Sequence, residues 1–250
     1  MDYSRAEQIL IFVDLDNTLF QSKRKDPLAI HPASTVENPF KGSFMNDAQK
    51  VFFDLMMSHP KSCVIPVTAR DRNQYRRTFI SRDSRVQLAS LYFGAEILFQ
   101  DQVDINWKNH IESRLLLLST PVGEFQEFIK SIIKNDNLET KNIGGYYIVV
   151  KHKSKEDYQN ALQDCYLMLT SCLPSDYRLF FNDNNISIVP KCLDKKNAVQ
   201  YIIQKNNPIL TIGVGDSNSD WDFMDTCHYK IIPQKSQINQ TINAKIFLDA

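Results

Sequence analysis

Two aspartates and a threonine follow a short apolar run near the start of the sequence. The run is Ile9–Val13, and Asp14, Asp16 and Thr18 come after it. A buried parallel strand is predicted for the run, because it is too short for a helix and rich in branched and aromatic residues. Residues two apart face the same way in an extended chain. We therefore expect both carboxylates at the carboxyl end of this strand, where open α/β sheets bind ligands.

Two carboxylates held close together repel each other, and a bound cation relieves this repulsion. Oxygen ligands suit Mg²⁺, so the pair predicts a magnesium site. The alternative is a strand followed by an Asp-Asn turn whose acids are solvated. A motif as short as D-x-D-x-T does not separate the two readings without further polar groups nearby.

A second predicted strand, over residues 63–67, also ends in a polar group. Thr68 follows it directly, and Arg70 comes two residues later, just before a predicted helix start. A threonine in this place is suited to hydrogen-bond an anion, although it also suits a helix N-cap. Arg70 is suited either to pair with an acid or to contact a substrate.

A third predicted strand, over residues 209–214, ends close to Asp216, and a second acid, Asp220, follows four residues later. Each of three short apolar strands is thus followed closely by a polar residue, namely Asp14, Thr68 and Asp216. A helix predicted to begin near residue 191 adds Lys195 and Lys196 just upstream of the third strand.

The composition is that of an ordinary globular protein able to bury a sizeable core. The 250 residues are 43% hydrophobic and 23% charged, enough for one large domain or two small ones. The net charge is zero, with 29 basic and 29 acidic residues. Together with the lack of an apolar run near the ~18 residues of a membrane helix, this balance predicts no nucleic-acid and no membrane partner.

The cysteines and the first residues predict a cytoplasmic protein. The five cysteines are scattered and odd in number. We expect reduced thiols from this set, neither a disulfide framework nor a zinc site. The sequence begins without the basic start and apolar middle of a signal peptide.

The middle of the chain differs from its two ends, because residues 104–189 hold no strand-end carboxylate motif. We expect these residues to form an inserted second domain, and residues 1–103 and 190–250 to form an α/β core. The elements predicted for the insert are a helix over 122–133, a strand over 144–150, a helix opened by a capping box at 154–157, and a hairpin turning at 182–185. The elements predicted elsewhere are a loop over 21–44, a helix over 46–57, and short strands within 87–99 around Gly94.

The polar groups, taken in order, resemble the four motifs of the haloacid dehalogenase (HAD) superfamily. The matching residues are Asp14-x-Asp16-x-Thr18, Thr68, Lys195 and Gly215-Asp216-x-x-x-Asp220. The insert between the threonine and lysine motifs resembles the C2-type cap of the sugar-phosphatase branch. The segment from Ile188 to Val199 is similar to the one that enters the lysine motif in trehalose- and sucrose-phosphate phosphatases. This resemblance implies a Rossmann-like parallel-sheet core with an inserted α+β C2-type cap domain.

Three positions depart from that pattern. Asn17 stands where many relatives have Gly, Ser219 where many have Asn, and Lys196 where Gly is frequent. The predicted cap strand carries no sugar-binding signature that can be transferred. The resemblance therefore supports the superfamily and its branch better than any named sugar.

The resemblance also implies roles for the acids. Asp14 would be the nucleophile that forms an aspartyl-phosphate, and Asp16 the general acid and then the general base. Mg²⁺ would be held by the Asp14 carboxylate, the Asp16 backbone carbonyl and Asp216. Asp220 is a further candidate metal ligand, although orienting a metal-bound water or Lys195 suits it better.

The resemblance implies that the remaining motif residues act on the phosphate group of the substrate. Thr68 would hydrogen-bond the transferring phosphoryl group and Lys195 would offset its charge, with Lys196 as the rival lysine. Arg70 is a further candidate for substrate binding. The cap would close over the site and set the specificity. Its polar candidates are Lys151, His152, Lys153 and Arg178.

The function expected from these roles is Mg²⁺-dependent hydrolysis of a small-molecule phosphate ester, with a sugar phosphate in first place. Asp at position 16 favours hydrolysis over the ATPase branch, which carries Thr there. Two alternatives stay open: a phosphotransferase or phosphomutase of the same fold, and a non-catalytic protein that binds a phosphorylated metabolite. The presence of all the core acids and of Lys195 disfavours the second.

Overall fold

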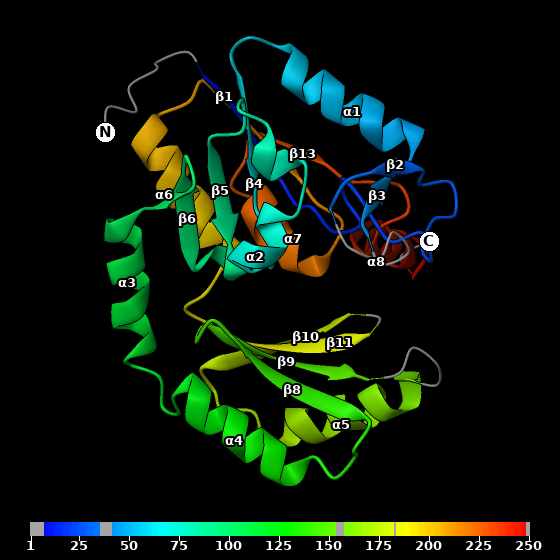
Figure 1. Ribbon diagram of the computed structural model, residues 1–250, viewed down its shortest axis with the longest axis vertical. Coiled ribbons are helices and arrows are strands. Elements are labelled where there is room, and N and C mark those ends of the chain that lie inside the picture. Colours follow the sequence, from blue (N-terminus) through cyan, green and yellow to red (C-terminus); the bar gives the residue numbers. More distant parts are fainter. Residues whose placement is uncertain (1–7, 36–41, 154–157, 183, 249–250) are drawn as a thin grey trace. The chain divides into compact units, whose positions relative to one another are not determined.

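The computed structural model describes residues 8–35, 42–153, 158–182 and 184–248. The chain forms two compact units, one made of the residues up to Asp104 and from Asp194 onward, the other of Ile105–Leu193 (Figure 1). The sequence placed the two boundaries at residues 103/104 and 189/190.

The first unit is built on a parallel sheet with the strand order β13-β12-β1-β4. These strands are β1 (Ile9–Val13), β4 (Ser62–Pro66), β12 (Leu210–Val214) and β13 (Tyr229–Ile231). All neighbours pair in parallel, and Val13 lies opposite both Pro66 and Val214. The three strands that precede the polar motifs therefore end at the same level, which confirms the predicted parallel α/β core.

The helices of the first unit are α1 (Asp47–Ser58), α2 (Arg72–Arg76), α6 (Lys195–Asn206), α7 (Asn218–Met224) and α8 (Gln237–Leu248), with the short 3₁₀ helix η2 (Ile80–Arg82). The start predicted for α6, near residue 191, is wrong by a few residues. Asp194 is the N-cap of this helix, and its carboxylate accepts a hydrogen bond from the backbone N–H of Lys196. Lys195 is consequently the first residue of α6.

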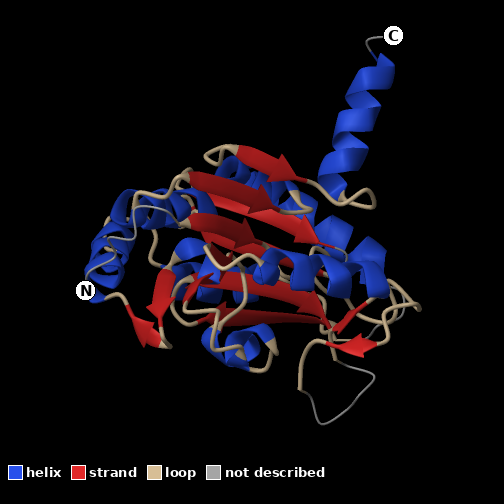
Figure 2. Ribbon diagram, turned by 90° about the horizontal axis from the view of Figure 1, so that it is seen from above, coloured by secondary structure: helices blue, strands red, loops and turns tan. Residues whose placement is uncertain are grey.

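The helix α8 extends away from the rest of the first unit (Figure 2). Its anchor is at its first turn, where Ile238 is buried and its backbone N–H donates to the carbonyl of Asp216, 3.0 Å away. Among the described residues, no helix has the length and apolar character needed to cross a membrane.

A small antiparallel sheet, β5-β6-β7, also belongs to the first unit. It consists of β5 (Leu88–Leu91), β6 (Glu96–Phe99) and β7 (Gln102–Val103), with the 3₁₀ helix η3 (Tyr92–Gly94) between the first two. The short strands predicted around Gly94 are therefore present. The segment predicted as a loop over 21–44 contains the short strand β2 (His31–Pro32) and the first residue of its partner β3 (Phe44–Met45).

The second unit pairs an antiparallel sheet, β10-β11-β9-β8, with helices (Figure 1). Its elements are α3 (Ile105–Leu115), α4 (Val122–Ile132), β8 (Leu138–Ile143), β9 (Tyr147–His152), α5 (Tyr158–Cys172), β10 (Tyr177–Asn182) and β11 (Asn185–Pro190). One core cluster joins Phe125 and Ile129 of α4 to Ile148 and Val150 of β9 and to Leu162 of α5. This unit is the α+β insert that the sequence predicted.

Two predictions for the insert need correction. The strand predicted from residue 144 begins at Tyr147, because Gly144 and Gly145 have positive φ angles of 65° and 80° and form the turn between β8 and β9. The strand β8 was missed, since its sequence is largely polar. The capping box predicted at 154–157 lies outside the described residues.

Gly94 allows η3 to pack closely against the start of α6. Its φ angle is +93°, and an added Cβ would lie only 2.4 Å from the backbone oxygen of Asp194. Gly94→Ala should therefore lower the free energy of unfolding by about 1–3 kcal/mol, because the added Cβ overpacks this contact and the backbone conformation is unfavourable for alanine. Urea unfolding followed by circular dichroism measures the change.

Gly123→Ala is the matched control for this substitution. Gly123 lies within α4, and an added Cβ would meet no atom within 4 Å. The alanine should raise the stability by about 0.5–1 kcal/mol, because glycine is the poorer helix residue. Equal effects at the two positions would show that the close approach at Gly94 is not a constraint.

Candidate active site

Asp14 is held at the end of β1 by a tight turn that follows it. Its backbone N–H donates to the carbonyl of Val214, and the N–H of Leu19 donates back to that of Leu15. Asn17 has a positive φ angle of 66°, which an asparagine adopts more readily than most residues. The chain thus turns over residues 15–20.

The two carboxylates of the first motif differ in exposure and in partners, and whether they converge on one ligand stays a prediction. The side chain of Asp14 is 8% exposed, whereas that of Asp16 is 52% exposed. The carboxylate of Asp16 binds the guanidinium of Arg70, at 2.7 and 2.8 Å. The charge of Asp16 still adds to the burial and the other charges that raise the pKa of Asp14, so the two groups interact.

The acids that do converge come from three elements of the first unit. Carboxylate oxygens of Asp14, Asp216 and Asp220 all lie within 4.8 Å of one another. They follow β1, follow β12 and belong to α7, respectively. All three are buried, and Asp220 is fully so. Thr18 joins the cluster, since its hydroxyl donates to Asp216 at 3.1 Å.

Lys195 forms ion pairs with two of these carboxylates. The ammonium nitrogen of Lys195, whose side chain is 3% exposed, lies 2.7 Å from Asp14 and 2.6 Å from Asp220. Three buried carboxylates face a single buried ammonium group. When all are ionised, the cluster carries an excess of negative charge, which a proton or a bound cation would relieve.

The pKa values reflect this excess. Burial, followed by the charge of Asp220, raises the pKa of Asp14 well above its ordinary value, against the opposing effect of Lys195. Burial and Asp220 likewise raise the pKa of Asp216 to about 7. Burial alone would lower the pKa of Lys195, yet Asp14 and Asp220 raise it above its ordinary value. The ammonium stays charged, while the pKa values of Asp14 and Asp216 remain raised despite it.

The donor set fits a magnesium ion, which prefers oxygen ligands and one or two carboxylates. Asp220 binds Lys195 through one oxygen, and its other oxygen accepts from the backbone N–H and hydroxyl of Ser217. Both of its oxygens are thereby engaged, which suits orienting Lys195 better than binding a metal. Asp14 and Asp216 are the better pair of carboxylate ligands.

Ser217 was missed in the sequence, although a signal was present. Ser217 and Asp220 form a capping box at the start of α7, and the spacing S-x-x-D is a recognised mark of that arrangement. The same contact that starts the helix fixes the carboxylate of Asp220 for Lys195.

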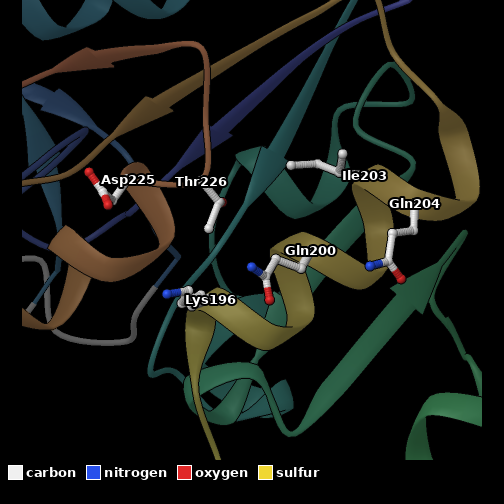
Figure 3. Close-up of a pocket in the computed structure, with 6 residues that line it drawn as sticks. All are labelled: Lys196, Gln200, Ile203, Gln204, Asp225 and Thr226. Atoms are coloured by element: carbon white, nitrogen blue, oxygen red, sulfur yellow. The ribbon is translucent and has the colours of Figure 1, made fainter.

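Lys196, the alternative to Lys195, lies away from the carboxylate cluster. Lys196 lines a hollow of about 380 Å³ between α6 and the residues that follow α7 (Figure 3). Its other lining residues are Gln200, Ile203, Gln204, Asp225 and Thr226. Consecutive residues of one helix point in different directions, so Lys195 reaches the acids and Lys196 does not share that position.

Thr68 and Arg70 follow the neighbouring strand. Val67 donates its N–H to the carbonyl of Val13, which brings Thr68 to the level of Asp14. The hydroxyl of Thr68 is buried and accepts from the backbone N–H of Arg70 at 3.2 Å. Arg70 pairs with an acid, Asp16, which is one of the two contacts the sequence indicated for it.

The polar candidates of the insert lie on β9 and β10 or just after β9. The ammonium of Lys151 is 3.6 Å from Glu139, and Lys153 is exposed. Arg178 donates to the carbonyl of Leu193 at 2.6 Å and lies over the ring of Phe180. His152 ends β9 and is half-buried. A substrate contact by any of them stays a prediction.

Sequence comparison finds no family model and no curated protein that matches this chain. Comparison of structures does find similar folds. The sucrose-phosphatase of Synechocystis sp. PCC6803, in complex with sucrose and phosphate, superposes with a TM-score of 0.56 at 14% identity, over 97% of this chain and 98% of that chain. The C-terminal domain of C. albicans trehalose-6-phosphate phosphatase gives 0.56 at 15% identity, over 90% and 75% of the two chains.

A haloacid dehalogenase-like hydrolase from B. subtilis is similar in the same way. Its TM-score is 0.53 at 14% identity, over 92% of this chain and 90% of that chain. At such identities the likeness is one of fold. The chain has the fold of the HAD-like hydrolases, as its ordered motifs predicted.

Without a divalent cation, the stability of the protein should depend on pH through Asp216. The pKa of this carboxyl is about 7 in the folded protein, against an ordinary value of about 4 in the unfolded chain. Between these values the folded state binds more protons than the unfolded state, so raising the pH lowers the free energy of unfolding. Asp216→Asn should remove this contribution.

Urea unfolding in chelator at several pH values measures the difference between the wild type and D216N. Asp222→Asn is the matched control, because Asp222 is exposed on α7, and it should keep the wild-type slope. The same slope in all three proteins would contradict a raised pKa at Asp216.

Lys195 and Lys196 should differ sharply in their effect on stability. Lys195→Met leaves Asp14 and Asp220 buried without their counter-charge, so we expect a loss of about 3–5 kcal/mol. Lys196→Met removes a half-exposed charge away from the cluster and should change the free energy of unfolding by less than about 1 kcal/mol. Urea unfolding in chelator near neutral pH measures both, and equal losses would argue against a buried Lys195 pair.

Proposed function

We propose that the protein is a Mg²⁺-dependent phosphatase that hydrolyses a small phosphorylated metabolite, with sugar phosphates as the first substrate class. The observation that carries the proposal is the buried cluster of Asp14, Asp216, Asp220 and Lys195 beside the ends of parallel strands. The fold supports it, because similar structures include a sucrose-phosphatase and a trehalose-6-phosphate phosphatase.

Asp14 is the proposed nucleophile. A carboxylate that approaches a phosphate dianion meets charge repulsion, and Lys195 at 2.7 Å offsets part of it. Mg²⁺, held by Asp14, Asp216 and the backbone carbonyl of Asp16, would supply further positive charge for this approach. Thr68 is proposed to donate a hydrogen bond to the transferring phosphoryl group.

The proposed reaction has two steps. An oxygen of Asp14 bonds to phosphorus, the bond to the leaving oxygen breaks, and Asp16 gives that oxygen a proton. Asp16 then takes a proton from a water molecule, the water oxygen bonds to phosphorus, and the bond to Asp14 breaks. Phosphate and the alcohol are the products, and both carboxyl groups return to their first state.

Specificity is proposed to come from the second unit, which forms the cap domain of this fold. Lys151, His152, Lys153 and Arg178 are its polar candidates for contact with the alcohol part of the substrate. A cytoplasmic location is proposed from the odd and scattered set of cysteines, which suits a reducing compartment.

Phosphate release from a panel of sugar and polyol phosphates tests the proposal. Activity should require Mg²⁺ and be lost in chelator. Asp14→Asn should lower kcat by at least about a thousandfold, because it removes the nucleophile itself. Asp222→Asn, an exposed aspartate of α7, should retain activity and shows that the loss is specific.

Activity that survives in D14N would rule out the proposed nucleophile. Isomerisation of a hexose phosphate without net release would favour phosphotransfer instead. Tight binding of phosphate analogues with no turnover of any ester would favour a binding protein.

A further inference from the structure

The guanidinium of Arg70 binds the carboxylate of Asp16 through two parallel hydrogen bonds. Its Nε donates to Oδ2 at 2.8 Å and its Nη2 donates to Oδ1 at 2.7 Å. This fork arrangement fixes the plane of the carboxylate as well as its distance, which a single hydrogen bond does not do.

Arg70 is itself held in place from several sides. Its Nη2 also donates to the hydroxyl of Ser43 at 3.1 Å, and its Nη1 donates to the carbonyl of Gln74 at 3.4 Å. The guanidinium carbon lies 4.9 Å from the centre of the Phe20 ring, a cation–π contact. These bonds engage four of the five N–H groups of a side chain that is only 15% exposed.

Asp16 has little else to fix it. Its side chain is 52% exposed and lies outside the carboxylate cluster. Within the described part of the chain, the side-chain hydrogen bonds that hold its carboxylate come from Arg70. An exposed aspartate without such a fork would move among several rotamers.

We infer that Arg70 is a positioning residue, which sets the orientation of the Asp16 carboxylate for its proton transfers. This inference rests on the proposed function, in which Asp16 serves the leaving oxygen. Arg70 acts through Asp16, because both oxygens of that carboxylate face it and four of its N–H groups bind the protein. The sequence indicated either an acid or a substrate as the partner of Arg70, and positioning assigns a task to its contact with the acid.

The leaving group of the substrate separates positioning from a general structural role. An alkyl phosphate leaves as an alkoxide, which needs a proton from Asp16 as the bond to phosphorus breaks. A p-nitrophenyl phosphate leaves as a stable phenolate and needs no such proton. Weakening the fork should therefore slow the first substrate much more than the second.

The experiment measures kcat/KM for the best sugar phosphate and for p-nitrophenyl phosphate. Arg70→Gln should lower kcat/KM by about 10- to 100-fold for the sugar phosphate and by less than about threefold for the aryl phosphate, since general acid catalysis contributes about 10²–10⁴-fold. Arg70→Lys should behave like R70Q, because an ammonium group keeps the charge but has no fork.

Arg76→Gln is the matched control. Arg76 binds Asp101 with the same pair of nitrogens, at 3.2 and 2.7 Å, but this pair is exposed and neither residue belongs to the cluster. Both substrates should be turned over at wild-type rates by R76Q. Thermal melts of all variants establish that each is folded.

A double-mutant cycle with Asp16→Asn checks that Arg70 acts through Asp16. In the D16N background, R70Q should cause no further loss with the sugar phosphate, because the group that it positions is already gone. Additive losses, equal losses for both substrates, or faster turnover in R70Q would each overturn the inference.

Crystal structures of the wild type and R70Q decide the matter without any turnover. The Asp16 carboxylate should occupy one orientation in the wild type and several in R70Q, and an unchanged orientation in R70Q would overturn the inference. If the wild type hydrolyses no phosphate ester, the proposed function is contradicted. The two crystal structures then still test whether Arg70 orients the Asp16 carboxylate.

Discussion

The ammonium group of Lys195, shared between Asp14 and Asp220 at 2.7 and 2.6 Å, is the interaction on which the site depends. A lone buried charge is costly, so the two carboxylates and the lysine require one another. Other features serve this arrangement. Asp194 starts α6 so that Lys195 is its first residue, and Ser217 fixes the far oxygen of Asp220. One ammonium does not balance three acids, and this imbalance favours a bound proton or cation at the cluster.

The two carboxylates of the first motif differ in burial and in the charges around them. Burial and then the charge of Asp220 raise the pKa of Asp14, which favours a bound proton or cation beside it. Asp16, two residues later, is half-exposed and is held by the fork of Arg70. Two acids placed in different environments are suited to different tasks, one to attack phosphorus and the other to move protons.

The sequence predicted what depends on local pattern and on the order of motifs. Apolar runs revealed β1 and its neighbours in the parallel sheet, because strands buried on both faces are continuously apolar. Polar β8 has no such run, and its pairing with β9 rests on long-range contacts that a local pattern does not carry. The placement of the Asp16 carboxylate involves Arg70, 54 residues away. A contact over this separation does not follow from i, i+2 spacing.

Trapping of the covalent intermediate tests the central claim, that Asp14 attacks phosphorus, most directly. Enzyme mixed with a turned-over sugar phosphate and Mg²⁺ is quenched in acid, treated with borohydride, which reduces an aspartyl-phosphate to homoserine, and digested with trypsin. The peptide Ala6–Lys23 carries both Asp14 and Asp16, and fragment ions distinguish them. We expect homoserine at position 14. Phosphate release with an unmodified Asp14, or homoserine at position 16, would contradict this mechanism.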